Sequence, residues 1–222
     1  MFPLRDTQPS YSKPVVTVLI IVINLLVFLY EASLDPYTQN AFIATYGLVP
    51  DHFQYANILT SMFLHGGWMH VLGNMWFLWI FGDNIEDILG HGKYLVFYLL
   101  CGVVAALTQV VFNYYSRVPM VGASGAIAGV MGAYLVKFPS SRIRTAVFVF
   151  FILFLDVPAW VMLIYWFAIQ LFSGVGSLGD TQVSQGGTAF FAHVGGFISG
   201  IVLVNLMGAR QRYSSRRDLY WR

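Results

Sequence analysis

Charged side chains are scarce in this 222-residue chain. Asp, Glu, Lys and Arg together make up 10% of the residues, against about 25% in an ordinary soluble domain. Hydrophobic residues make up 58% and the mean hydropathy is +0.68, so a water-soluble core could not cover the apolar surface. The net charge of +2 is small, and no nucleic-acid partner is expected. The composition predicts a polytopic helical membrane protein surrounded by the lipid bilayer.

Cysteine is nearly absent as well. Cys101 is the single cysteine and lies in an apolar stretch, so a disulfide within the chain is excluded and a packing role is expected. The sequence also lacks His-Glu-x-x-His, a motif of zinc proteases. We therefore expect neither a metal site nor a cofactor.

Long apolar stretches are abundant. A membrane-spanning helix needs about 20 mostly apolar residues, and six segments fit: about 14–32, 68–88, 93–115, 122–137, 157–174 and 188–207. Asp156 and Pro158 interrupt the apolar stretch 146–174, which is too long for one span. The segment 146–155 is therefore expected to lie along the membrane interface or to pack separately. The predicted fold is all-α, a bundle of six transmembrane helices.

Lysine and arginine are distributed unevenly between the connecting segments. If both termini are cytoplasmic, all but one of the 12 Lys and Arg residues lie inside, and Arg117 alone lies outside. This asymmetry is the usual sign of orientation in membrane proteins. The chain is thus predicted to comprise a cytoplasmic segment (1–13), a six-helix membrane domain (14–207) and a basic cytoplasmic tail (208–222).

Four polar residues fall at a common depth under this orientation. His70 and Asn74 lie near the start of the second predicted helix, Ser124 starts the fourth, and His193 lies near the start of the sixth. At a rise of about 1.5 Å per residue, each lies within about 10 Å of the outer end of its helix. Ionisable residues inside a membrane are costly and usually functional. A site just beneath the outer surface is expected.

Ser124 and His193 are the types of residue that act as nucleophile and base. A serine hydroxyl is a weak nucleophile until a neighbouring base, usually histidine, takes its proton. Each of the two residues precedes a pair of glycines that lets helix backbones approach closely: Gly125, Gly129, Gly196 and Gly200. If these two faces meet, the hydroxyl and the imidazole come within hydrogen-bonding distance. Packing without chemistry would explain the glycines equally well, but not the polar residue near each pair.

His70 and Asn74, four residues apart, share one face of a helix. Together with the backbone N–H of Ser124 they could bind the negative oxygen of a tetrahedral intermediate. The alternative is a pair that hydrogen-bonds neighbouring helices together. No acidic residue is placed in the outer half of the sixth helix, so a Ser–His dyad without a buried carboxylate is predicted. His65, just before the second helix, is expected to stabilise a loop.

These motifs resemble those of the rhomboid family of intramembrane serine proteases, in the family's order on its second, fourth and sixth helices. They read His70-x-x-x-Asn74, Gly122-x-Ser124-Gly125 and Ala192-His193-x-x-Gly196-x-x-x-Gly200. The resemblance implies that Ser124 is the nucleophile, that His193 is the base, and that His70 and Asn74 stabilise the oxyanion. It also implies an endopeptidase that cleaves transmembrane protein substrates near the extracytoplasmic face. A prokaryotic plasma (inner) membrane is the expected location.

The chain departs from some members of that family. An aromatic residue four positions after the serine packs on the catalytic histidine in some members, and Ala128 stands there in this chain. Some members carry a Trp-Arg pair in the first outer loop, and this loop has no arginine. These departures leave open how His193 is braced and how the loop docks.

Three other functions are alternatives to the serine protease. One is a catalytically silent rhomboid-like protein that binds client transmembrane helices. Another is a transporter, for which no inverted repeat is visible. The third is an aspartyl protease, because Ser177-Leu178-Gly179-Asp180 resembles the Gly-x-Gly-Asp motif, although it lacks the first glycine and an aspartate partner at its depth.

Overall fold

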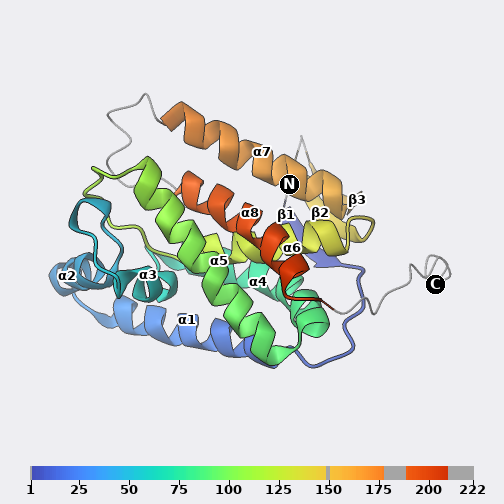
Figure 1. Ribbon diagram of the computed structural model, residues 1–222, viewed down its shortest axis with the longest axis horizontal. Coiled ribbons are helices and arrows are strands. Elements are labelled where there is room, and N and C mark those ends of the chain that lie inside the picture. The colour runs from blue at the N-terminus through green and yellow to red at the C-terminus, as the bar shows by residue number, and fades with distance from the viewer. Residues whose placement is uncertain (1, 149–150, 178–188, 210–222) are drawn as a thin grey trace.

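The computed structural model describes residues 2–148, 151–177 and 189–209, and Figure 1 shows their course. Most of these residues are helical, and six long helices form the bundle. They are α1 (Val15–Ser33), α4 (Trp68–Leu89), α5 (His91–Phe112), α6 (Ser124–Lys137), α7 (Ala159–Ser177) and α8 (Phe190–Leu206). Each overlaps one of the six apolar segments identified in the sequence. The expectation of a mainly helical bundle is confirmed.

Not all six helices have the length and apolarity of a membrane span. Among the described residues, α1, α5 and α7 do, whereas α6 and α8 are apolar but shorter. Figure 1 shows α1 and α7 along opposite edges of the bundle, with α5 and α8 between them. The count of six spans and the cytoplasmic position of both termini stay predictions. Beyond residue 209, the predicted basic tail lies outside the described residues.

The short helix α6 is the centre of the bundle. It packs against α4, α5, α7 and α8, and every residue from Gly125 to Tyr134 is buried. Its contact with α8 is a contact of backbones, because a Cβ at Gly196 would overlap the carbonyl oxygen of Gly125, and one at Gly200 would overlap that of Gly129. The predicted close approach of the two glycine-bearing faces is confirmed.

The long connection between α1 and α4 is folded. It contains α2 (Pro36–Tyr46), η1 (Pro50–His52), α3 (Asn57–Thr60) and η2 (Ser61–Phe63). The Asn57 side chain donates to the carbonyl oxygens of Thr45 and Gly47, which closes the turn after α2. Leu48 and Met120 exchange both backbone hydrogen bonds. This bridge docks the connection against the segment that leads into α6, and it does so without the Trp-Arg pair.

A three-stranded antiparallel sheet is the element that the prediction of an all-α fold missed. Its strands are β1 (Phe2–Asp6), β2 (Arg142–Phe148) and β3 (Ile152–Pro158), in the order β1-β2-β3. Ile143 and Thr145 are buried while Arg142 and Arg144 are exposed, which is the period-two alternation of a strand. The β2–β3 hairpin accounts for most of the segment 146–155, and β1 joins Phe2–Asp6 to this hairpin.

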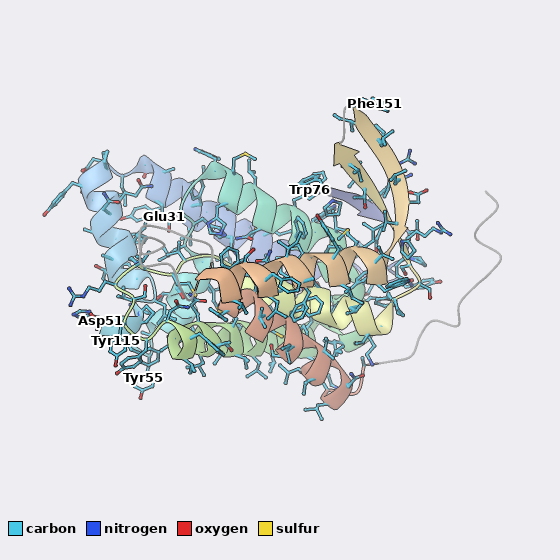
Figure 2. All side chains as sticks on the ribbon, turned by 90° about the horizontal axis from the view of Figure 1, so that it is seen from above. Glu31, Asp51, Tyr55, Trp76, Tyr115 and Phe151 are labelled. Carbon is cyan, nitrogen blue, oxygen red and sulfur yellow. The ribbon has the colours of Figure 1, made fainter. Side chains whose placement is uncertain are left out.

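Side chains of the bundle hold β1 in place. The indole Nε1–H of Trp76 donates to the carbonyl oxygen of Pro3 at 2.7 Å, and the ring of Phe2 stacks on that of Trp76. The Tyr134 hydroxyl donates to the Asp6 carboxylate. Burial raises the pKa of Asp6 to about 7. Figure 2 shows Trp76 beside β1, whereas Phe151 lies at the far end of the hairpin, away from the bundle.

At the opposite end of α4 from the predicted site, Glu86 fixes the start of α1. Its buried carboxylate accepts the backbone N–H groups of Val16 and Thr17 and the Thr17 hydroxyl. No side chain of α1 itself caps these N–H groups. A carboxylate at a helix N-terminus satisfies otherwise unpaired donors and interacts favourably with the helix dipole. Glu86 therefore serves as the N-terminal cap of α1 from a different helix.

Candidate active site

The predicted nucleophile and base are in contact. Ser124 is the first residue of α6 and His193 lies in the first turn of α8, and the close backbone packing of these helices brings their N-terminal ends together. The Ser124 Oγ lies 2.7 Å from the His193 Nε2. This is the hydrogen-bonding distance expected of a serine and its general base.

The second ring nitrogen of His193 has a partner that the sequence analysis missed. The Nδ1 of His193 lies 2.7 Å from the Oε1 of Gln170 on α7. A carboxamide oxygen can only accept a hydrogen bond, so the Nδ1 carries the proton and the Nε2 presents a lone pair to the Ser124 hydroxyl. Among the described residues, the two ring nitrogens of His193 are bonded to Gln170 and Ser124.

The face of the His193 ring is covered from α7 as well. The ring centroid of Trp166 lies 5.6 Å from that of His193, and the Trp166 ring also packs on Phe197. Ala128, at the position where some related sequences carry an aromatic residue, is fully buried in α6. The brace on the histidine therefore comes from α7 instead of α6.

His70 and Asn74 of α4 reach the same place. Both line one cavity with Ser124 and His193. Gly122, two residues before Ser124, has a φ of 122°, and a Cβ built on it would lie 2.8 Å from the His70 Nε2 and 3.5 Å from the Asn74 Nδ2. Glycine is required here both for its backbone conformation and for the space that the two side chains occupy. The structure thus brings together all four residues singled out from the sequence.

Hydrogen bonds from the preceding loop orient these two side chains. The backbone N–H of Gly66 donates to the His70 Nδ1 at 3.4 Å, which leaves the Nε2 of His70 to carry the ring proton. Burial lowers the pKa of His65 to about 4, so its neutral ring accepts from the Asn74 amide at 3.0 Å through the Nε2. The second N–H of Asn74 is left to face the site. His65 therefore has the stabilising role that was expected of it.

Glu31 completes this arrangement and was not identified from the sequence. It lies near the end of α1, is fully buried, and accepts the backbone N–H of His65 at 3.1 Å; Figure 2 shows its position on the bundle. The one signal in the sequence was an acidic residue at the end of an apolar helix. Through His65, α1 contributes to the position of Asn74.

The cavity that holds these residues has a volume of about 620 Å³. Polar side chains from the α5 end and the following turn, Gln109, Asn113 and Ser116, line it beside the four predicted residues. Gln109 also accepts the backbone N–H of Ala192 at 3.1 Å, which secures the first turn of α8. A cavity with this lining can hold water and an extended peptide segment next to Ser124.

Metal and aspartyl chemistry were also considered. Within residues 2–148, 151–177 and 189–209, no group of three or more His, Cys, Asp or Glu side chains is placed to hold a metal ion. The segment Ser177–Asp180, weighed as an aspartyl-protease motif, lies beyond Ser177 outside the described residues.

Comparison with known proteins gives one family. The model of the Rhomboid domain matches residues 52–210. The chain is 33% identical to rhomboid protease GluP of Bacillus subtilis over 135 residues, which are 59% of this chain and 26% of that protein. It is 28% identical to rhomboid protein 1, mitochondrial, of Saccharomyces cerevisiae over 152 residues, which are 66% of this chain and 40% of that protein. It is 35% identical to the human presenilin-associated rhomboid-like protein, mitochondrial, over 92 residues, which are 39% of this chain and 23% of that protein. The chain thus matches well under half the length of each relative.

Proposed function

Since this chain belongs to the rhomboid family, we propose that it is an intramembrane serine endopeptidase whose catalytic pair is Ser124 and His193. The observation that carries the proposal is the 2.7 Å contact between the Ser124 Oγ and the His193 Nε2. The Nδ1–H of His193 donates a hydrogen bond to the Gln170 oxygen, so the Nε2 keeps a lone pair that can accept a proton. A pair used only for packing would not need this arrangement.

The mechanism follows from the hydrogen bonds. His193 takes the hydroxyl proton as the Ser124 Oγ attacks the scissile carbonyl, and it later gives that proton to the leaving amine. The oxyanion is held by the Nε2–H of His70, the free N–H of Asn74 and the backbone N–H of Ser124 at the start of α6. Each such donor typically contributes about 2.7–4 kcal/mol of transition-state stabilisation. Water in the cavity then hydrolyses the acyl-enzyme.

The substrate is a transmembrane protein, and the reaction takes place near the extracytoplasmic face. This proposal includes six spans with both termini cytoplasmic, and its support is the distribution of Lys and Arg. A helix with satisfied backbone bonds hides its carbonyls, and exposing unpaired peptide groups to lipid costs several kcal/mol each. Substrate helices weakened by Gly or Pro near their outer end are therefore preferred. A prokaryotic plasma membrane is the proposed location; one of the relatives is bacterial, and two are named as mitochondrial.

The experiment is cleavage in proteoliposomes together with labelling by a fluorophosphonate. The wild-type protein is expected to cleave a transmembrane substrate and to be labelled at Ser124, and Ser124→Ala and His193→Ala are expected to lose both activities. The matched controls are Ser33→Ala and His52→Ala, since both side chains are exposed outside the cavity.

The outcome also decides between the protease and a catalytically silent protein that binds client helices. A silent protein would still capture the substrate, but the wild type and Ser124→Ala would behave alike. Cleavage that is equal in the wild type and in both catalytic variants would refute the proposed function.

A further inference from the structure

We propose that Gln170 is a positioning residue of the site. It selects the tautomer of His193 that can act as a base. The inference rests on the proposed protease function, because it assigns a role to Gln170 in the same reaction. It adds a third helix, α7, to the two that carry the catalytic pair.

The geometry around the imidazole is the first argument. His193 is bonded at both ring nitrogens, to the Ser124 Oγ and to the Gln170 Oε1, at 2.7 Å in each case. A neutral imidazole has one N–H and one lone pair, and these can exchange places. In one tautomer the Nε2 accepts the serine proton; in the other it already carries a proton and cannot.

The second argument is that burial makes the choice between tautomers strong. His193 is 7% exposed, and a buried polar group without a partner is expensive. If the Nδ1 gave up its proton, its lone pair would face the lone pairs of the Gln170 oxygen. With the Gln170 oxygen turned toward the ring, as it is in the structure, the N–H···O bond exists in the productive tautomer alone. Gln170 therefore disfavours the unproductive form without bringing a charge into the membrane.

The arrangement on α7 supports a positioning role over a contact by chance. Trp166 and Gln170 are four residues apart and so lie on the same face of the helix. Trp166 packs against the His193 ring, while Gln170 bonds the ring edge. The Trp166 contact restrains tilting of the His193 ring, and the Gln170 hydrogen bond restrains its rotation. The ring stack of Phe167 on Phe197, at 4.8 Å between centroids, holds α7 against α8 at the same level.

Other groups near His193 do not duplicate this role. Among the described residues, His70 of α4 is the titratable side chain that lines the cavity beside His193, and it approaches from the side of Gly122. Gln109 bonds the backbone of Ala192 and not the ring. The described part of the chain thus offers the Nδ1 of His193 one acceptor, Gln170.

The test combines labelling kinetics with nitrogen NMR of histidine-labelled protein, with His193→Ala used to assign the signals. In the wild type, the Nδ1 of His193 is expected to be protonated and the Nε2 unprotonated. Gln170→Leu keeps the bulk but removes the acceptor. It is expected to give a mixture of tautomers and to slow fluorophosphonate labelling about tenfold, the worth of one hydrogen bond, with an unchanged KM for a transmembrane substrate.

Gln170→Glu is the rescue variant, and Gln54→Leu, an exposed loop substitution, is the matched control. Gln170→Glu restores an acceptor, so labelling is expected to recover. Its negative charge favours the imidazolium, so the acidic limb of the pH–rate profile is expected to move to higher pH. If Gln170 were merely structural, Gln170→Leu would change neither the tautomer of His193 nor the labelling rate.

Three results would overturn the inference: a wild-type His193 protonated at the Nε2, labelling of Gln170→Leu at the wild-type rate, or equal losses in folded Gln170→Leu and Gln170→Glu. The wild-type NMR result decides the matter even if Gln170→Leu does not fold. If the wild type is labelled no better than Ser124→Ala, the proposed function fails. The tautomer measurement then still reports separately on Gln170.

Discussion

Gly200→Ala should move Ser124 and His193 apart without touching either residue. Gly200 lies seven residues after His193, about 10 Å along α8. An added Cβ would overlap the carbonyl oxygen of Gly129 and would also lie within 2.6 Å of its Cα. Because these are backbone atoms, no side chain can turn away to relieve the overlap, and α8 must move away from α6.

The magnitude follows from two opposing effects. Overpacking of this kind costs about 1–3 kcal/mol, with a backbone clash at the upper end, whereas alanine is favoured over glycine in a helix by about 1 kcal/mol. The net loss of stability is therefore about 2 kcal/mol. A displacement of about 1 Å at the site can lower the rate about 100-fold, so activity should suffer more than folding.

The assay measures fluorophosphonate labelling of Ser124 and thermal unfolding in the same detergent. Gly176→Ala is the control, since a Cβ there meets nothing within 4 Å and the residue lies in α7. It should be at least as stable as the wild type and equally reactive. If Gly200→Ala reacts at the wild-type rate with an unchanged unfolding midpoint, then backbone contact between α6 and α8 does not set the distance between Ser124 and His193.

Three further substitutions probe other parts of the molecule. Asn74→Ala removes one proposed oxyanion donor and should lower kcat about 100- to 1,000-fold with little change in KM, measured by cleavage in proteoliposomes; a loss confined to KM would contradict the assignment. Glu86→Gln replaces an oxygen that accepts helix N–H groups by a donor and should lower stability by about 1–2 kcal/mol, and an unchanged unfolding midpoint would show that Glu86 is not the cap of α1. Asp6 has its pKa raised from an ordinary 3.8 to about 7 by burial; the folded state binds the extra proton between these values, so stability should fall as the pH rises through that window and be constant above it. Asp6→Asn should flatten this dependence in unfolding curves taken from pH 4 to 8, whereas Asp35→Asn, at an exposed carboxylate, should leave it in place.

The contact between Ser124 and His193 could be predicted because its signals are local. Ser124 and His193 each stand beside small residues in their own helix, and the geometry that joins them is fixed by contacts between glycines. Such a contact tolerates little variation, since a Cβ at Gly196 or Gly200 meets a backbone carbonyl. A spacing pattern on two helices was therefore enough to predict a hydrogen bond between residues 69 positions apart.

The sheet could not be predicted in the same way. Its central strand pairs on one side with Ile152–Pro158, which is near in sequence, and on the other with Phe2–Asp6, which is more than 130 residues away. When the partner strand is unknown, an apolar segment next to a predicted membrane span is interpreted as part of that span. The alternation of Arg142, Ile143, Arg144 and Thr145 was the available signal, and it covers only four residues.

Gln170 marks the limit of such reasoning inside the bundle. A helix completes one turn in 3.6 residues, so neighbouring residues point in directions about 100° apart. A shift of α7 by a single residue would therefore carry Gln170 away from His193. The residues around it on α7 are almost all apolar, and a helix that is apolar all round gives no indication of which face looks inward. The remaining signal is the single glutamine among them, because a carboxamide inside a membrane is stabilised by a hydrogen bond to a neighbouring helix. The sequence therefore indicates that Gln170 has a hydrogen-bond partner but not which residue it is. The packing of α7 on α8 identifies the partner as His193.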